Sequence, residues 1–307
     1  MSKWNGDEGM GLSKYQAFLK TVELGSITRA AEELGYTQSA VSHMIADLEA
    51  EWAVSLLVRG RGGVTLSPAG AELLPDIRSV CNAQRELAER VGALHGLTRG
   101  TIRIGTITSI SVHWLPGIMK SFLEQYPGIR FELLGGVEYA EIEDWIVKGR
   151  VDCGFVGLPA GRELETISLR RDRLVAVLPK RHPLAEAESC PMERFAQEPF
   201  IRPEDDKDKE VAGIFERAGV RPNVEYAVND DYAVIAMVAS GLGISILPEL
   251  VLRRTPYEVV VKPLDPPQFR ELGLAVRSLR ELSPVTARFL PHVQAWLEEN
   301  GKTAPGP

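Results

Sequence analysis

The chain has 307 residues, enough for two or three domains of ordinary size. Its composition, 44% hydrophobic and 25% charged, is that of a globular protein and excludes a disordered or fibrous one. The net charge of −7 argues against a broadly basic surface for grasping nucleic acid.

Residues 12–67 have the pattern of a winged helix-turn-helix. Apolar residues at helical spacing predict three short helices before residue 53. Gly25 and Gly35 stand where a left-handed residue would end the first two helices, and Ser26 and Thr37 stand where an N-cap would start the next ones. Two short helices joined through residues 35–37 predict a helix-turn-helix.

The third helix turns an apolar stripe inward and a polar face outward. The outward residues of its first turns are Gln38, Ser39, Ser42 and His43. Such side chains donate and accept hydrogen bonds, and they stand where a recognition helix meets base edges in the major groove. The alternative, on this pattern alone, is the solvated polar face of an ordinary three-helix bundle.

The next segment, residues 56–66, reads as a β-hairpin with a glycine-rich tip. Arg59 and Arg61 project from it without acidic neighbours, which predicts a wing that contacts phosphates or the minor groove. Residues 68–96 then predict a long linker helix, capped by Ser67, whose apolar stripe would pair with a second copy of the chain. Pro75 predicts that this helix bends or begins nearer Asp76.

Four sequence segments carry a family resemblance: residues 26–31 (SITRAA), 38–42 (QSAVS), 47–49 (DLE) and 66–70 (LSPAG). They are similar to the LysR-type transcriptional regulators. The resemblance implies that the partner is double-stranded DNA, with the third helix in the groove and the wing arginines on the backbone. It also implies a homo-oligomer, commonly a dimer of dimers, and leaves RNA polymerase as a candidate partner.

From residue 101 onward, strands rich in Ile and Val alternate with helices of about ten residues, which indicates βαβ units around parallel sheets. We expect one lobe from residues 101–172 with 273–298, and a second lobe from residues 173–272. The segments 149–152 (GRVD) and 238–248 (VASGLGISILP) again resemble the LysR-type regulators. That resemblance implies a two-lobed, periplasmic-binding-protein-like α/β effector domain with a small inducer between the lobes.

Ligands of such sheets sit at the carboxyl ends of the strands. The predicted effector-binding residues are Thr108, Ser109, Val137, Arg202 and Glu204. Hydroxyls and backbone N–H groups near Thr108 suit an anion, although Ser109 or Ser111 capping the helix is the alternative. Arg202 could clamp an acid and Glu204 could receive an amine, but so mixed a charge run is more often a solvated rim.

Other classes of function find less support. No nucleophile elbow, dinucleotide-binding turn, phosphate-binding loop or metal-ligand spacing is present, so we expect no enzyme and no cofactor or metal. Three scattered cysteines, Cys81, Cys153 and Cys190, indicate a reducing cytoplasmic setting. The longest nearly apolar run, about 15 residues at 233–247, is shorter than the roughly 20 that cross a membrane.

Two alternatives stay open. One is a redox-sensing regulator that uses Cys190, the only candidate thiol, in a predicted loop. The other is a cytosolic solute-binding or enzymatic protein with an appended dimerisation module. Even the first 95 residues carry nine basic against twelve acidic side chains, so selective DNA binding would have to depend on groove contacts rather than on bulk charge.

Overall fold

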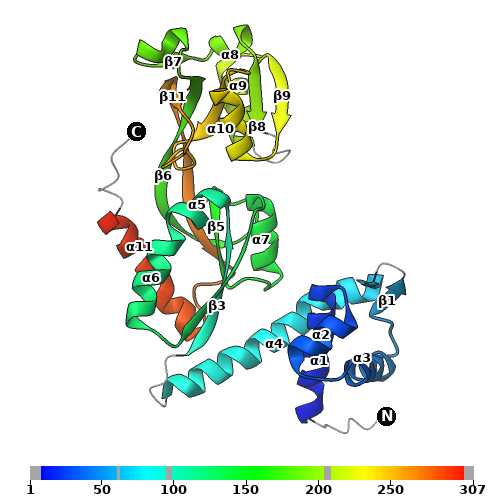
Figure 1. Cartoon of the computed structure of the whole chain (residues 1–307). Coiled ribbons are helices and arrows are strands. Elements are labelled where there is room, and N and C mark those ends of the chain that lie inside the picture. Colours follow the sequence, from blue (N-terminus) through cyan, green and yellow to red (C-terminus); the bar gives the residue numbers. More distant parts are fainter. Residues whose placement is uncertain (1–7, 61–62, 95–98, 204–208, 301–307) are drawn as a thin grey trace. The chain divides into compact units, whose positions relative to one another are not determined.

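A computed structural model of the chain describes residues 8–60, 63–94, 99–203 and 209–300. The chain divides into two compact units, one of residues 1–96 together with residues 148–150, and one of residues 97–147 and 151–307. Each unit has its own buried core, and Figure 1 shows the helices and strands of both units.

The first unit is a winged helix-turn-helix followed by a long helix. Its elements are α1 (Glu8–Leu24), α2 (Ile27–Leu34), α3 (Gln38–Trp52), β1 (Leu57–Gly60), β2 (Gly63–Leu66) and α4 (Pro68–Leu94). Strands β1 and β2 form an antiparallel hairpin, with Leu57 opposite Leu66. The predicted order of elements is confirmed.

The capping residues at the ends of these helices are also as predicted. The Ser26 side chain accepts a hydrogen bond from the Arg29 backbone N–H at 3.3 Å, and Thr37 caps α3 in the same way. Gly35 ends α2 with φ 72°, in the left-handed region that glycine adopts without strain. The helix boundaries are therefore set by residues that satisfy the backbone groups a helix end leaves open.

Helix α4 differs from one expectation. Its cap is Ser67, whose Oγ accepts a hydrogen bond from the Gly70 N–H at 2.9 Å, so the helix begins at Pro68 and not near Asp76. Pro75 lies inside the helix. A proline removes one backbone donor and crowds the preceding turn, but here the helix continues through it.

The second unit has two lobes. The elements of the first lobe are β3 (Gly100–Thr106), α5 (Thr108–His113), α6 (Leu115–Gln125), β4 (Ile129–Gly135), α7 (Tyr139–Val147), β5 (Cys153–Leu158) and α11 (Pro284–Asn300). The elements of the second are η1 (Pro183–Glu186), β7 (Cys190–Pro191), α8 (Arg194–Gln197), β8 (Phe200–Pro203), α9 (Lys209–Ala218), β9 (Val224–Val228), α10 (Asp231–Ala239) and β10 (Ser245–Pro248). Two long strands, β6 (Glu165–Pro179) and β11 (Val259–Val276), run through both lobes (Figure 1).

The sheet is more continuous than the predicted pair of parallel sheets. Its strand order is β10-β6-β11-β5-β3-β4, with β7 paired to β11. In the first lobe, β3 pairs in parallel with β4 on one side and with β5 on the other. Strand β11 runs antiparallel to both β5 and β6. The predicted crossings near residues 171–174 and 269–274 thus lie within two paired strands, each of which runs from one lobe into the other.

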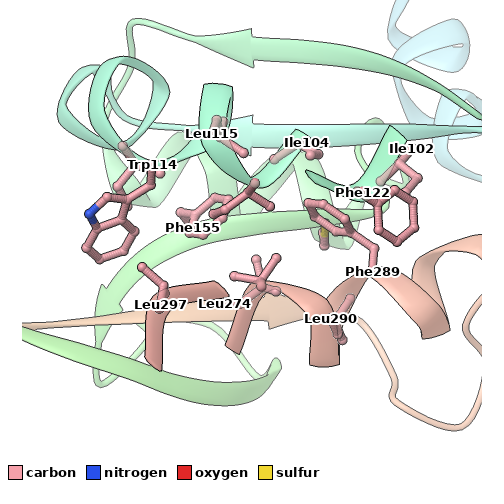
Figure 2. Close-up of a cluster of buried hydrophobic side chains, with 14 of the residues drawn as sticks. Ile102, Ile104, Trp114, Leu115, Phe122, Phe155, Leu274, Phe289, Leu290 and Leu297 are labelled. Carbon is pink, nitrogen blue, oxygen red and sulfur yellow. The ribbon is translucent and has the colours of Figure 1, made fainter. Parts of the chain in front are cut away.

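A buried apolar cluster holds the first lobe together. Figure 2 shows Phe122 of α6 and Phe155 of β5 facing Phe289 and Leu290 of α11 across the cluster. The Phe122 and Phe289 rings meet edge to face, with centroids 5.3 Å apart. The C-terminal helix therefore returns to the first lobe, as expected. Within the described ranges, no helix is long and apolar enough to span a bilayer.

Candidate functional site

The first candidate site is the N-terminal face of α3. Gln38, Ser39 and His43 are exposed and Ser42 is half-buried. The opposite side of the helix is anchored in the core by Val41, Ile45 and Leu48, which are at most 1% exposed. The predicted polar face is therefore present. A fixed helix with a free polar face is what recognition of base edges in the major groove requires.

The wing is tied to this face through Arg59. The Arg59 side chain is exposed, and its Nη2 donates a hydrogen bond to Ser42 Oγ at 3.1 Å. Two residues predicted separately, one on the helix and one on the hairpin, are thus adjacent. The other predicted wing arginine, Arg61, lies outside the described residues.

Sequence reasoning missed the residue that fixes the wing. In the sequence, Glu49 stands out only as the last residue of the segment 47–49 (DLE). Its Oε1 accepts hydrogen bonds from the backbone N–H groups of Leu56 at 2.6 Å and Leu57 at 3.1 Å. On the other strand, the Val64 N–H donates to the Gly25 carbonyl at 3.0 Å. A carboxylate that accepts two backbone donors orients the hairpin against the helix.

The second candidate site is a cleft in the second unit, with a volume of about 490 Å³. Its lining comes from both lobes and from β6 and β11. Thr108, Ser109 and Val137, three of the five residues predicted to bind an effector, lie in this lining. Neither Ser109 nor Ser111 caps α5: its N-cap is Ile107, without a side-chain hydrogen bond.

Of the two remaining predicted effector residues, the structure describes Arg202, and it does not line the cleft. Arg202 is exposed on β8 and is absent from the lining, whereas the next residue, Pro203, is part of it. Successive side chains of a strand point to opposite faces, so Pro203 and Arg202 cannot both face the cleft. Glu204 lies outside the described residues.

Arg270 is the buried basic residue of the cleft, and sequence reasoning missed it. It is 7% exposed, and its Nη2 and Nε lie 2.8 and 2.9 Å from Asp172 Oδ2. Its Nη1 donates to the Tyr139 hydroxyl at 3.1 Å and its Nη2 to Ser109 Oγ at 3.3 Å. Burial lowers the pKa of the guanidinium, but Tyr139 and Asp172 raise it by more, so the group stays charged.

This network links the two lobes. Asp172 also accepts a hydrogen bond from the Leu250 backbone N–H at 3.1 Å through Oδ1. Tyr139 and Ser109 belong to the first lobe, while Leu250 follows β10 of the second. No local sequence signal could reveal this network, because Asp172 and Arg270 are brought together only by the register of β6 against β11.

The cysteines do not support a redox site. Cys190 is fully buried in β7 rather than in a loop, and burial followed by the nearby Glu198 raises the pKa of its thiol to about 11. Burial likewise raises the pKa of Cys153 and of Cys81. Protonated, buried thiols are poor nucleophiles. In the part of the chain that the structure describes, no His, Cys, Asp and Glu side chains cluster in a way that could hold a metal ion.

Two family models match the chain. The model for "Bacterial regulatory helix-turn-helix protein, lysR family" matches residues 12–71, and that for "LysR substrate binding domain" matches residues 95–298. The first match identifies the N-terminal segment as a regulatory helix-turn-helix rather than as a dimerisation module alone.

Similar proteins span the same length. The "Uncharacterized HTH-type transcriptional regulator YvbU" of Bacillus subtilis is 32% identical over 284 residues, which is 92% of this chain and 97% of that protein. The "Probable HTH-type transcriptional regulator LrrA" of Synechococcus elongatus is 30% identical over 298 residues, 96% of this chain and 98% of that protein.

Solved structures share the fold. A full-length OxyR variant from Pseudomonas aeruginosa superposes with a TM-score of 0.76 at 20% identity, covering 94% of each chain. Full-length CbnR complexed with its target DNA gives a TM-score of 0.65 at 22% identity, covering 93% of this chain and 99% of that one.

Proposed function

The chain belongs to the LysR family of transcriptional regulators, and from that premise we propose a separate function for each of its two sites. The face of α3 reads DNA sequence through Gln38, Ser39, Ser42 and His43. The cleft of the second unit binds a small-molecule effector that alters this DNA binding. We propose no catalytic step and no cofactor beyond that effector.

The observation that carries the DNA-binding proposal is the contact between Ser42 and Arg59. Ser42 Oγ accepts a hydrogen bond from Arg59 Nη2 at 3.1 Å. The serine hydroxyl hydrogen then remains to donate to a base edge, such as guanine O6 or N7 or thymine O4. The guanidinium, exposed beside it, can contact a phosphate. Sequence reading and backbone binding thus come from neighbouring side chains.

The proposed assembly is a homo-oligomer paired through α4. Four apolar side chains on this helix are exposed to between 46 and 86%: Val80, Leu87, Val91 and Leu94. Their spacing of seven, four and three residues keeps them on one side of a helix, the pattern of a two-helix seam. A dimer places two recognition helices on one duplex, where half-sites about one helical turn, roughly 34–36 Å, apart can be read together. A regulator that acts at promoters also meets RNA polymerase there, so the polymerase stays a proposed partner.

The proposed effector acts by favouring one arrangement of the lobes. A ligand shifts a conformational equilibrium only when it binds one state better than another. Ser109 and Tyr139 of the first lobe contact Arg270 on β11 at the edge of the cleft. A ligand that competes for these hydrogen bonds would change the orientation of the first lobe relative to the long strands.

The test of the DNA-binding proposal is selection of preferred sequences from a random duplex library. The full chain should enrich a two-part motif. The Ser42→Ala/His43→Ala double variant should keep weak, salt-dependent binding but enrich no motif, because backbone contacts remain when base contacts are lost. Ser55→Ala, an exposed serine outside the proposed contact set, should enrich the wild-type motif. An unchanged motif in the double variant would refute the proposed face.

A further inference from the structure

We propose that the cleft of the second unit takes a positively charged amine as its ligand. This inference rests on the proposed function, because it accepts the cleft as the effector site and adds the chemical class of the effector. A volume of about 490 Å³ suits a small molecule with one or two rings.

The lining is acidic. Four of the described lining residues carry a carboxylate: Glu138, Glu141, Asp230 and Asp231. Among those same described residues, Arg270 is the single basic side chain, and its charge already faces Asp172 at 2.8 Å. A cation entering the cleft is therefore attracted and an anion repelled.

Two of the helices that begin at the cleft, α10 and α7, already carry the chain's own carboxylates at their first turns. Helix α10 starts at the cleft, and Asp230 Oδ1 accepts the Ala233 N–H at 2.9 Å, with Asp231 in the first turn. Helix α7 starts there from the other lobe, with Glu138 before it and Glu141 in its first turn. The positive ends of both helices thus already have negative partners, and an anionic ligand would compete with them.

The rest of the lining suits the body of such a ligand. Tyr139 and Tyr232 contribute aromatic residues from opposite lobes, and the lining also includes the apolar residues Val137, Leu174 and Ile246. Aromatic faces attract cations as well as apolar surfaces. The lining therefore fits an ammonium group carried on an apolar or aromatic body.

The test uses two probes of similar shape and opposite charge, phenethylamine and 3-phenylpropanoate. Each is titrated into the full chain by calorimetry at low salt, in the millimolar range expected for so small a ligand. Phenethylamine should bind saturably, and its affinity should fall as salt is raised. The carboxylate probe should show no saturable binding.

Three variants locate the binding. Asp230→Asn removes one charge but keeps a good helix cap, and Glu141→Gln removes one from the other lobe. Each should weaken phenethylamine binding by about fivefold, the effect of one unit charge roughly 4 Å away in a wet cleft. Glu225→Gln, an exposed acidic residue on β9 that is not in the lining, should leave the affinity unchanged.

Three results would overturn the inference: tighter or equal binding of 3-phenylpropanoate, no saturable binding of phenethylamine, or an equal loss in Glu225→Gln and Asp230→Asn. None of them decides the proposed function, which the DNA selection judges independently. If the carboxylate probe saturates the cleft and changes DNA affinity, the proposed function as a regulator stands. Only the proposed positive charge of the ligand is then wrong.

Discussion

Asp172 and Arg270 face each other directly across β6 and β11, with the side chains 8% and 6% exposed and joined at 2.8 Å. They pair at the level where the two long strands pass from one lobe to the other. Ser109 and Tyr139 of the first lobe and Leu250 of the second hydrogen-bond to the same pair. The ion pair is therefore the polar centre of the junction between the lobes and one wall of the cleft.

Breaking this pair should destabilise the protein. Asp172→Asn leaves a buried guanidinium without its counter-charge, and we expect the free energy of unfolding to fall by about 3 kcal/mol. Urea unfolding measures the change. The control is Lys180→Met, which breaks an exposed pair with Glu258 at 2.9 Å and should cost less than about 1 kcal/mol. Equal losses in the two variants would contradict a special role for the buried pair.

Removing the wing arginine should weaken binding to every duplex alike. Arg59→Ala removes a phosphate contact, so the slope of log affinity against log salt should become shallower by about one. Arg59→Lys retains the charge and should keep the slope, while losing the forked hydrogen bonding that reaches Ser42. Fluorescence anisotropy over a salt series measures both. A loss confined to one base position would instead make Arg59 a reader of bases.

Gly70 should not tolerate a methyl group. A Cβ at this residue would lie 2.1 Å from the Leu56 carbonyl oxygen, where α4 meets the start of the wing. We expect Gly70→Ala to lower the melting temperature, with a loss of about 2–3 kcal/mol, as overpacking does elsewhere. Gly11→Ala, in α1 with open space around the new methyl, should raise stability by about 0.5 kcal/mol. The two substitutions should change stability in opposite directions, and a loss of stability in neither or in both would contradict the prediction.

Cys190 should contribute to a decline of stability at alkaline pH. Folding raises the pKa of this thiol from 9.0 to about 11, so between these values the unfolded state holds fewer protons than the folded one. The stability that the buried thiol provides is therefore complete below pH 9 and lost as the pH rises through about 11. Urea unfolding over this range should show a smaller decline in Cys190→Ala than in the wild type. Identical declines would show that Cys190 does not set the pH dependence.

Pairing through α4 should be sensitive to charge in its apolar stripe. Leu87 is 62% exposed in the single chain, so Leu87→Glu should leave the fold intact and weaken dimerisation at least tenfold, because a charge would be buried in the seam. Ala88→Glu adds the same charge at an exposed residue outside the stripe and should have little effect. Sedimentation equilibrium measures both. A dimer unaffected by Leu87→Glu would place the contact elsewhere.

The sequence by itself determined the local architecture of the first unit. Ser26, Gly35 and Thr37 act on their immediate neighbours, because helix caps and left-handed turns are properties of a few consecutive residues. The polar face of α3 follows from helical spacing alone. The family resemblance to LysR-type regulators was equally readable, because its motifs are short and contiguous.

Only the tertiary structure decided how the cleft is built. Thr108, Ser109 and Val137 were within reach of sequence reasoning because they follow strand ends, where cleft residues are expected. Arg202 could not be placed, since a shift of one residue along a strand reverses the direction of its side chain.

The same limit hid the pairs that join distant segments. Asp172 and Arg270 are 98 residues apart, and Glu49 reaches the wing through backbone donors that carry no side-chain signature. Their meeting depends on strand register and on how a hairpin folds back against a helix. These are long-range relationships that no window of neighbouring residues contains.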